Sequence, residues 1–189
     1  KKIIVANQTT MSKYDIETTL SKIDLIDTPQ DFVFIGTAAG VYYLDMDKVL
    51  VEGERSVKFL EGSTGIMPNI YAYGISRSTV NGKMAIATTG GVVVVDDIMN
   101  KLNKQLVSDD TQVFTNRNGL VGSAAYDVMW THDEKLICCT SNGLAITTDL
   151  TSFTSITRTK NTHTNKGKIL CVSRDDFICF DFLTIKFFK

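Results

Sequence analysis

The sequence predicts an all-β fold built from repeated antiparallel sheets, and three observations lead to that prediction. Short apolar runs rich in Val, Ile, Phe and Tyr follow one another along the 189-residue chain, with turn residues between them. Such runs are typical of strands and hairpins. A Thr-x-x-Gly sequence recurs between pairs of runs at a nearly constant spacing. Long helical patterns are almost absent, which leaves strands as the main element.

The Thr-x-x-Gly sequence marks an internal repeat. Its three full copies are VFIGTAAGVYYLD from Val33, MAIATTGGVVVVD from Met84 and ICCTSNGLAITTD from Ile137, and a decayed fourth is LCVSRDDFICFD from Leu170. The glycines of the full copies, Gly40, Gly91 and Gly143, are 51 and 52 residues apart. We predict that each copy is a hairpin in which Gly supplies the positive φ of the turn.

Each full repeat has room for four strands. In the first repeat we expect strands at 22–27, 32–35, 41–44 and 57–60, after strand-like runs at 3–6 and 14–20. The second repeat predicts strands at 70–76, 83–87, 92–96 and 112–114, and the third at 126–130, 136–139, 144–147 and 153–157. Ile98, Leu102 and Leu106 stand at four-residue spacing, which predicts a helical insertion within the second repeat.

Four short antiparallel strands repeated about every 40–50 residues predict a β-propeller, or an arc of one. The strands are nearly continuous in apolar residues, so we expect both faces of each sheet to be covered, as they are when blades stack around an axis. The repeat places N-terminal strands of a closing blade at 1–21, blade 1 at 22–60, blade 2 at 61–114 with the insertion near 97–107, blade 3 at 115–158 and part of blade 4 at 159–189.

The charge balance narrows the range of partners. Twenty basic and 21 acidic residues give a formal charge of −1, so no overall positive field attracts nucleic acid or an anionic membrane. We expect the basic cluster of Arg158, Lys160, Lys166 and Lys168 to be a solvated loop. No apolar run approaches the roughly 20 residues of a membrane span, so membrane insertion is not expected.

The four cysteines do not form a metal-binding pattern. Cys138 and Cys139 are neighbours on a predicted strand and therefore point to opposite faces, and neither histidine lies near a cysteine pair in the sequence. We expect these thiols to be buried and reduced. A three-residue turn at 174–176 sets Cys171 opposite Cys179 within reach of a disulfide, and a one-residue change of register removes that pairing.

One segment resembles a known family of repeats. VFTNRNGLVGSAAYDVMWTHDEKLICCTSNGLAITTD, from Val113, is similar to the propeller repeats in sensor domains of hybrid two-component regulators. Asn118-Gly119-Leu120 matches the start of those repeats, and Thr140 with Gly143-Leu144 matches their end, as Gly36-Thr37 with Gly40-Val41 does in the first copy. The family usually carries a Trp within the second strand, whereas Trp130 ends a first strand here. The resemblance extends over about residues 22–181 and implies a propeller of the same general design.

Residues that carry chemistry are sparse. The break at 88–91 lacks the lysine and the following helix of a phosphate-binding loop, and the acidic fragments at 45–47 and 116–119 do not continue into a calcium loop. The two histidines, His132 and His163, lie in predicted polar loops, and the adjacent carboxylates at 96–97, 109–110 and 175–176 diverge on a strand. We therefore expect no metal, no cofactor and no catalytic residue; an alternative is a glycan-active enzyme that draws residues from several blades.

Binding residues are expected on the face that carries the loops between blades and the Thr-x-x-Gly turns. The loops are 61–68, 115–122 and 160–168. The side chains that we predict as ligand or partner contacts on this face are Asn116, Arg117, Asn118, Asn142, Arg174 and Met67.

The sequence therefore predicts a non-enzymatic recognition or assembly module within a larger protein or particle. One setting is a phage tail or receptor-binding component of a virion, which contacts other protein subunits or a cell-surface ligand. The alternative setting is a ligand-sensing ectodomain of the two-component type. The position of Trp130 and the decay of the fourth repeat favour the virion. Both settings favour a virion, extracellular or periplasmic location over the cytoplasm.

Overall fold

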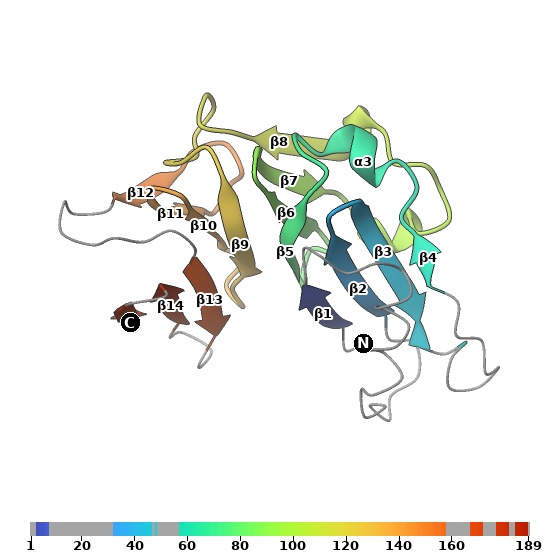
Figure 1. Ribbon diagram of the computed structural model, residues 1–189, viewed down its shortest axis with the longest axis horizontal. Helices are drawn as coiled ribbons and strands as arrows, with labels where there is room; N and C mark the ends of the chain where they lie inside the picture. The colour runs from blue at the N-terminus through green and yellow to red at the C-terminus, as the bar shows by residue number, and fades with distance from the viewer. Residues whose placement is uncertain are drawn as a thin grey trace.

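Four β-sheets make up the chain and follow one another in an arc (Figure 1). The computed structural model describes residues 3–7, 32–46, 48, 57–157, 167–171, 177–181 and 184–188. Helix contributes little to this part of the chain, and the all-β prediction is confirmed.

The first sheet has the strand order β1-β2-β3-β4. Its strands are β1 (Ile3–Asn7), β2 (Phe32–Thr37), β3 (Gly40–Asp45) and β4 (Lys58–Phe59). β1 runs parallel to β2, whereas the other pairs are antiparallel. The chain between β1 and β2 is long enough for the crossover that a parallel pair needs. The strands predicted at 14–20 and 22–27 lie outside the described residues, and β1 holds the position expected for 22–27.

The second and third sheets are each four-stranded and antiparallel throughout. The second contains β5 (Ala72–Arg77), β6 (Met84–Thr88), β7 (Gly91–Val95) and β8 (Thr111–Phe114). The third contains β9 (Ala125–Trp130), β10 (Leu136–Thr140), β11 (Gly143–Thr147) and β12 (Thr154–Thr157). Each strand overlaps the run that predicted it.

The fourth sheet has three described strands, β13 (Gly167–Cys171), β14 (Phe177–Asp181) and β15 (Thr184–Phe188). The register sets Cys171 opposite Phe177 and Cys179 opposite Ile169. The connection between β13 and β14 is therefore five residues long instead of the three expected at the turn. This shift of register separates Cys171 from Cys179, which the shorter turn would have set face to face.

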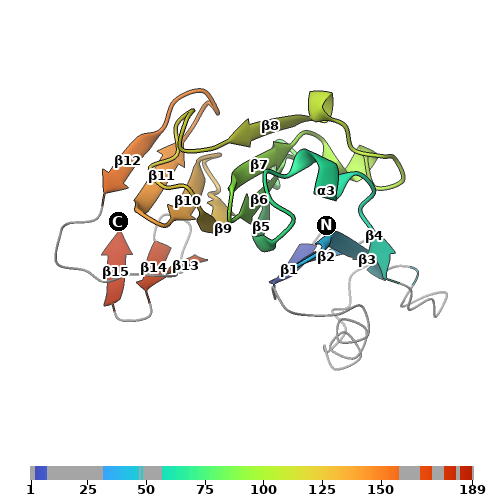
Figure 2. The ribbon, with the colours of Figure 1, turned by 45° about the horizontal axis from the view of Figure 1, so that its top comes forward.

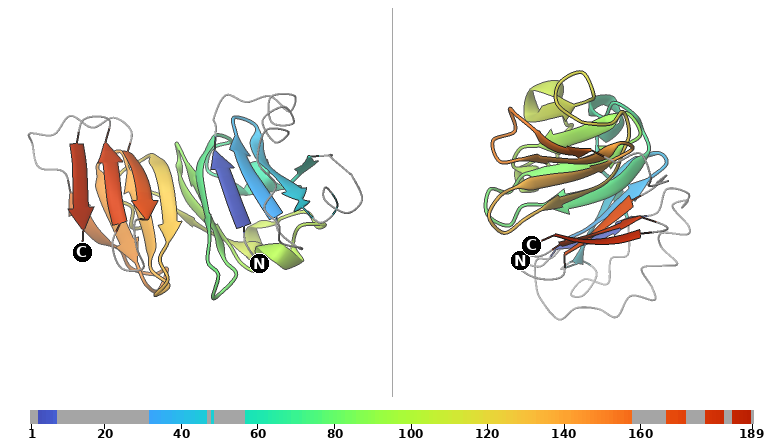
Figure 3. Two further views of the ribbon diagram at one scale, coloured as in Figure 1. Left: turned by 90° about the horizontal axis from the view of Figure 1, so that it is seen from below. Right: turned by 90° about the vertical axis from the view of Figure 1, so that its left-hand side faces the viewer.

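The first strands of the four sheets lie on the inner side of the arc. β1 contacts β5, β5 contacts β9, and β9 contacts β13, and Figures 2 and 3 show the sheets fanning outward from this side. We call β1, β5, β9 and β13 the inner strands.

The second sheet is buried on both faces, which explains why MAIATTGGVVVVD is continuously apolar. Successive side chains of a strand point to opposite faces. Met84 and Ile86 of β6 belong to a core shared with the first sheet, whereas Ala85 and Ala87 belong to a core shared with the third. All four side chains are fully buried. The covered faces are those of stacked blades.

The two cores differ in the size of their side chains. The core between the second and third sheets includes four alanines, which are Ala85, Ala87, Ala125 and Ala145. The core toward the first sheet carries larger side chains from the second sheet, such as Met84 and Ile86 of β6 and Ile75 of β5. Small residues let backbones approach closely, and β9 accordingly lies against both β5 and β6. The inner strands of the second and third sheets are thereby brought together.

The insertion between β7 and β8 packs on the first sheet but is not a continuous helix. It contains two single 3₁₀ turns, η1 (Ile98–Asn100) and η2 (Ser108–Asp110). Ile98, Leu102 and Leu106 are buried in the core shared with the first sheet. The Leu106 N–H donates to the Glu61 carbonyl, and the Leu102 carbonyl accepts from Tyr43. These tertiary hydrogen bonds use backbone groups that a helix would pair internally. The short helix α3 (Ser63–Ile66) lies beside the insertion (Figure 1).

Candidate functional site

The three Thr-x-x-Gly turns share one hydrogen-bond pattern. The hydroxyls of Thr37, Thr88 and Thr140 donate to the carbonyls of Gly40, Gly91 and Gly143 at 2.9, 2.9 and 2.8 Å. Each hydroxyl also accepts the N–H two residues later in the turn. The glycines have φ values of 107°, 138° and 135°, which favour Gly. The threonines therefore close the hairpins, and we call the edge of the sheets that carries these turns the turn face.

Two of these turns fix the loops that lead into the inner strands. The Gly40 N–H donates to the Ile70 carbonyl at 3.1 Å, just before β5. The Ser141 N–H donates to the Ala124 carbonyl at 2.8 Å, just before β9. The starts of β5 and β9 are thus held by the rigid hairpins, which is how a scaffold presents a binding surface.

The inner strands β5 and β9 each contain a pairing irregularity at the equivalent position. In β5 the pairing to β6 shifts between Ala72 and Gly74, so Tyr73 is the extra residue. In β9 the pairing to β10 jumps from Ala125 to Asp127, so Tyr126 is the extra residue. Bulges re-aim side chains and are common next to active sites. Here the two re-aimed rings meet, with centroids 6.0 Å apart and an interplanar angle of 67°.

A glycine and a carboxylate follow the two tyrosines. Gly74 packs directly on β9, because a Cβ at this position would lie 2.5 Å from the Asp127 Oδ1 and 2.8 Å from the Asp127 Cα. The Asp127 carboxylate therefore lies over Gly74, between the two strands. Its Oδ1 accepts the Val128 N–H at 3.0 Å, which helps to fix its orientation. We call Tyr73, Tyr126 and Asp127 the axial site.

The sequence did not single out the axial site. The tyrosines lie within predicted strands, where an aromatic residue is ordinarily a packing residue. One signal was available: the Ala-Tyr pair at Ala72-Tyr73 recurs at Ala125-Tyr126, at the start of the first strand of each repeat. Only the strand pairing shows that both tyrosines are bulged.

The predicted contacts in the loop before β9 are exposed, and one of them has a structural role. Asn116 and Arg117 are exposed on the loop after β8. Asn118 accepts the Thr115 N–H at 2.6 Å and donates to the Val113 carbonyl at 2.8 Å, so its side chain holds the loop. Asn116 and Arg117 remain the side chains of this loop that are available to a partner.

Of the other predicted contacts, Asn142 is exposed and Met67 is buried. Asn142 is exposed at the tip of its turn and donates to the Val121 carbonyl at 3.3 Å, which ties the turn to the loop before β9. Met67 is only 7% exposed and belongs to the core between the first and second sheets, because α3 turns it inward. Met67 is therefore not available as an apolar contact at the surface. Arg174 lies outside the described residues.

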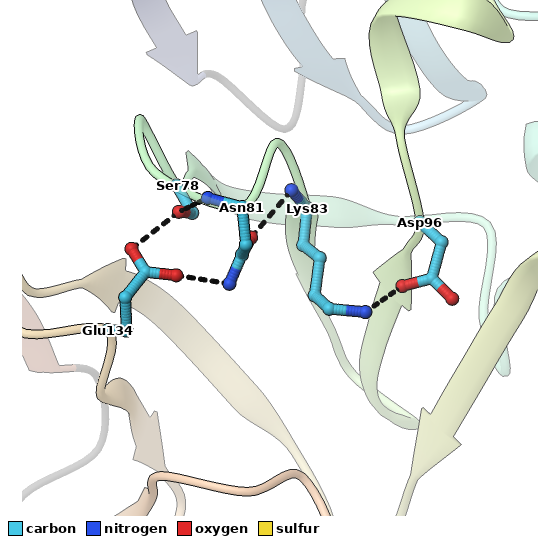
Figure 4. A network of polar contacts seen from close by, with 5 residues as sticks. All are labelled: Ser78, Asn81, Lys83, Asp96 and Glu134. Atoms are coloured by element: carbon cyan, nitrogen blue, oxygen red, sulfur yellow. Dashed lines mark hydrogen bonds and ion pairs between the residues drawn. The ribbon is translucent and has the colours of Figure 1, made fainter.

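The opposite edge of the second and third sheets carries a polar network (Figure 4). The Ser78 hydroxyl donates to Glu134 Oε1 at 2.7 Å, and the Asn81 side-chain amide donates to Glu134 Oε2. The backbone N–H of Trp130 donates to the Ser76 hydroxyl at 2.9 Å nearby. Lys83 pairs with Asp96 within the second sheet. Glu134 has a φ of 63°, and these bonds offset the strain of that conformation. The bonds from Ser78 and Asn81 to Glu134, and from Trp130 to Ser76, fasten the second sheet to the third.

The described part of the chain holds few other groups that carry chemistry. No three His, Cys, Asp or Glu side chains gather there as metal ligands. Cys138 and Cys139 are buried, and burial raises the pKa of the Cys138 thiol, which keeps it protonated. No described helix is long and apolar enough to cross a membrane.

Comparison with solved structures identifies the fold. The extracellular domain of a hybrid two-component system from B. thetaiotaomicron superimposes with a TM-score of 0.63 at 16% identity, over 82% of this chain. The extracellular domain of a one-component system from the same organism gives 0.60 at 18% identity over 78% of the chain. That of another hybrid two-component system gives 0.54 at 19% over 78%. The chain is an arc of a β-propeller.

The propeller arc spans about a fifth of each of these structures, covering 21%, 20% and 19% of their lengths. The resemblance to two-component sensor repeats inferred from the sequence is confirmed at the level of the fold. No family model matches the sequence. No curated protein matches it either.

Proposed function

We propose that this propeller arc belongs to a ligand-recognising domain of the sensor kind, which binds its ligand at the axial site without transforming it. One observation carries the proposal. Two bulges at equivalent positions of neighbouring blades turn Tyr73 and Tyr126 toward one another at the same end of the inner strands. A strand irregularity that recurs in the repeat, and that each time re-aims the same residue type, favours a use for the two rings beyond packing.

The surroundings of the axial site support recognition over catalysis. β5 and β9 carry no His, Cys or Lys, so neither strand supplies the imidazole that most often serves as a general base, or a thiol or amine nucleophile. The loops that enter the two strands are held by the hairpins of the turn face. A rigid aromatic surface with few conformational changes to make is well suited to binding.

The sensor setting is better supported than the virion setting. The solved structures described above are extracellular domains of two-component or one-component systems. Nothing in the fold points specifically to a phage tail or a receptor-binding fibre, so the alternative drawn from the sequence becomes the main proposal. An extracellular or periplasmic location is part of that proposal.

Fluorine NMR of protein labelled with 3-fluorotyrosine tests the proposal. The signals of Tyr73 and Tyr126 are assigned with the Tyr73→Phe and Tyr126→Phe variants, and a panel of monosaccharides, oligosaccharides, amino acids, amines and nucleosides is then added. We expect at least one compound to shift these two signals, to leave those of Tyr42 and Tyr43 in place, and to be recovered unchanged.

Two outcomes would overturn the proposal. Conversion of the bound compound by the purified protein would make the chain an enzyme. A panel in which every binding compound shifts other tyrosine signals, and none shifts Tyr73 or Tyr126, would place recognition elsewhere.

A further inference from the structure

We infer that Asn81 is a site of spontaneous deamidation, and that its conversion to an acid loosens the joint between the second and third sheets. The sequence contains Asn-Gly three times, at 81–82, 118–119 and 142–143. In Asn-Gly the side-chain amide is open to attack by the next backbone nitrogen, because glycine has no side chain to shield that nitrogen. Three features single out Asn81: the space around Gly82, the hydrogen bonds of the Asn81 amide, and the charge of its partner.

The reaction needs water as its only co-reactant. The backbone nitrogen of Gly82 attacks Cγ of Asn81, the new N–Cγ bond closes a succinimide ring, and the Cγ–Nδ2 bond breaks. The proton of the Gly82 N–H leaves with the side-chain nitrogen, as ammonia. Water then adds to one of the two ring carbonyls and opens the ring. This step restores the Gly82 N–H and leaves aspartate or isoaspartate in place of Asn81.

Gly82 has room to make this attack. It lies in the turn between β5 and β6, where Asn81 is exposed, and the nearest neighbour of a Cβ added to it would be Arg77 Nη2 at 3.9 Å. The Gly82 N–H donates to no residue that the structure describes. Gly119, by contrast, packs against Phe153, whose ring would lie 2.5 Å from an added Cβ. The turn at 81–82 can therefore close into the ring with less disturbance of its neighbours.

The hydrogen bonds of the Asn81 side chain favour the reaction. Its Oδ1 accepts the Lys83 N–H at 2.8 Å. Negative charge develops on this oxygen as the ring closes, and a donor already in place stabilises that charge. Its Nδ2 donates to the Glu134 carboxylate (Figure 4). This nitrogen gains a proton before it departs, and the adjacent negative charge stabilises the protonated form.

Deamidation turns an attractive contact between the two sheets into a repulsive one. Glu134 of the third sheet accepts from the Asn81 amide and the Ser78 hydroxyl of the second. After the reaction the carboxylate of residue 81 faces the Glu134 carboxylate, and the two negative charges repel. The amides of Asn118 and Asn142 donate to backbone carbonyls instead. A pair of facing carboxylates therefore forms only at position 81 among the three.

Peptide mapping of aged protein tests the site, because trypsin separates the three Asn-Gly sequences. Cleavage after Arg and Lys yields the peptides 78–83, 118–135 and 136–158. The native protein is incubated at physiological temperature and mildly alkaline pH, and mass spectrometry follows the conversion of each amide to an acid. We expect peptide 78–83 to convert first, to a mixture of aspartate and isoaspartate. Asn81→Gln is the matched control, because the longer side chain keeps the amide but disfavours ring closure, and its peptide should stay unconverted.

Variants measure the effect on the joint. Asn81→Asp reproduces one product and should lower the melting temperature by about 2–4 °C. The aged native protein should show a fall of the same size. Glu134→Gln removes the facing charge and supplies an amide that can donate to the new carboxylate. Asn81→Asp should therefore lower the melting temperature little further when Glu134→Gln is already present.

Each result bears on the inference. Conversion at 118 or 142 before 81, or an intact Asn81 in protein that stays folded through the incubation, would overturn the site. A folded Asn81→Asp variant that melts at the native temperature, or a loss that Glu134→Gln does not reduce, would overturn the effect on the joint. None of these measurements uses a ligand, so their outcome is independent of the proposed function.

Discussion

Single side chains stabilise the turns of this fold, and the Asp149 carboxylate accepts several hydrogen bonds within one turn. In the turn between β11 and β12 its Oδ1 accepts the N–H groups of Thr151 at 2.8 Å and Ser152 at 3.0 Å. The Thr147 hydroxyl donates to the same oxygen at 3.1 Å. The N–H groups of Ser152 and Thr151 hold the pKa of Asp149 well below its ordinary value, because they bind the ionised form.

The stability of the native protein should therefore fall in acid in part through Asp149. A carboxylate whose folded pKa is lowered stabilises the fold above its unfolded pKa, and that contribution disappears as the pH falls toward the folded pKa. Asp149→Asn has no charge to lose. We expect the difference in melting temperature between native protein and variant to be constant above about pH 5 and to shrink progressively below it. Melts by circular dichroism at a series of pH values measure this difference, and a gap that stays constant into strong acid would contradict the assignment.

The sequence was informative about residues that close turns and less so about residues that face a site. Thr88 and Gly91 were predicted as a hairpin, because Gly at positive φ and a following strand are local properties. Met67 was expected at the surface and is buried, since α3 and the packing of two sheets decide its direction. Tyr73 and Tyr126 were not predicted as a pair, because a bulge depends on how one strand pairs with the next.

Among the elements, the strands were predictable and the insertion was not. Short β-branched and aromatic runs bounded by turn residues specify strands locally. The spacing of Ile98, Leu102 and Leu106 suggested a helix, yet any path that buries all three side chains satisfies the same pattern. The parallel pairing of β1 with β2 could not be predicted from the sequence either, because it joins segments far apart in the chain.

The hydrogen bond from Tyr43 measures how strongly the insertion is held on the first sheet. Tyr43 is 4% exposed, and its hydroxyl donates to the Leu102 carbonyl at 2.8 Å. Tyr43→Phe keeps the ring and leaves that buried carbonyl without its donor, which costs about 1–3 kcal/mol. We expect the free energy of unfolding to fall by about this amount in urea denaturation.

Tyr42→Phe is the matched control for that prediction. Tyr42 is the next residue on β3, packs against Phe59 with ring centroids 5.1 Å apart, and makes no hydroxyl hydrogen bond to any described residue. Its stability should stay within about 0.5 kcal/mol of the native protein. Equal losses in the two variants would mean that the bond to Leu102 does not hold the insertion.

At the scale of the whole molecule, the arc depends on how closely neighbouring sheets approach. Alanines between the second and third sheets, and Gly74 against Asp127, bring β5 and β9 together. The bond from Ser78 to Glu134 fastens the same two sheets at the opposite edge. The repeat in the sequence indicated stacked blades, but the distance between them follows from side-chain sizes on facing strands. The axial site exists only because this distance is short.

The contact between the rings of Tyr73 and Tyr126 tests this account most directly. Nuclear Overhauser spectra of protein in which only tyrosine rings carry protons detect pairs of tyrosines in contact. We predict a cross-peak between Tyr73 and Tyr126, since their ring centroids are 6.0 Å apart, and its loss in the Tyr126→Phe variant, whose new ring carries no protons. A folded native protein with both tyrosine signals assigned and no cross-peak between them would contradict the stacking of the two blades and the axial site with it.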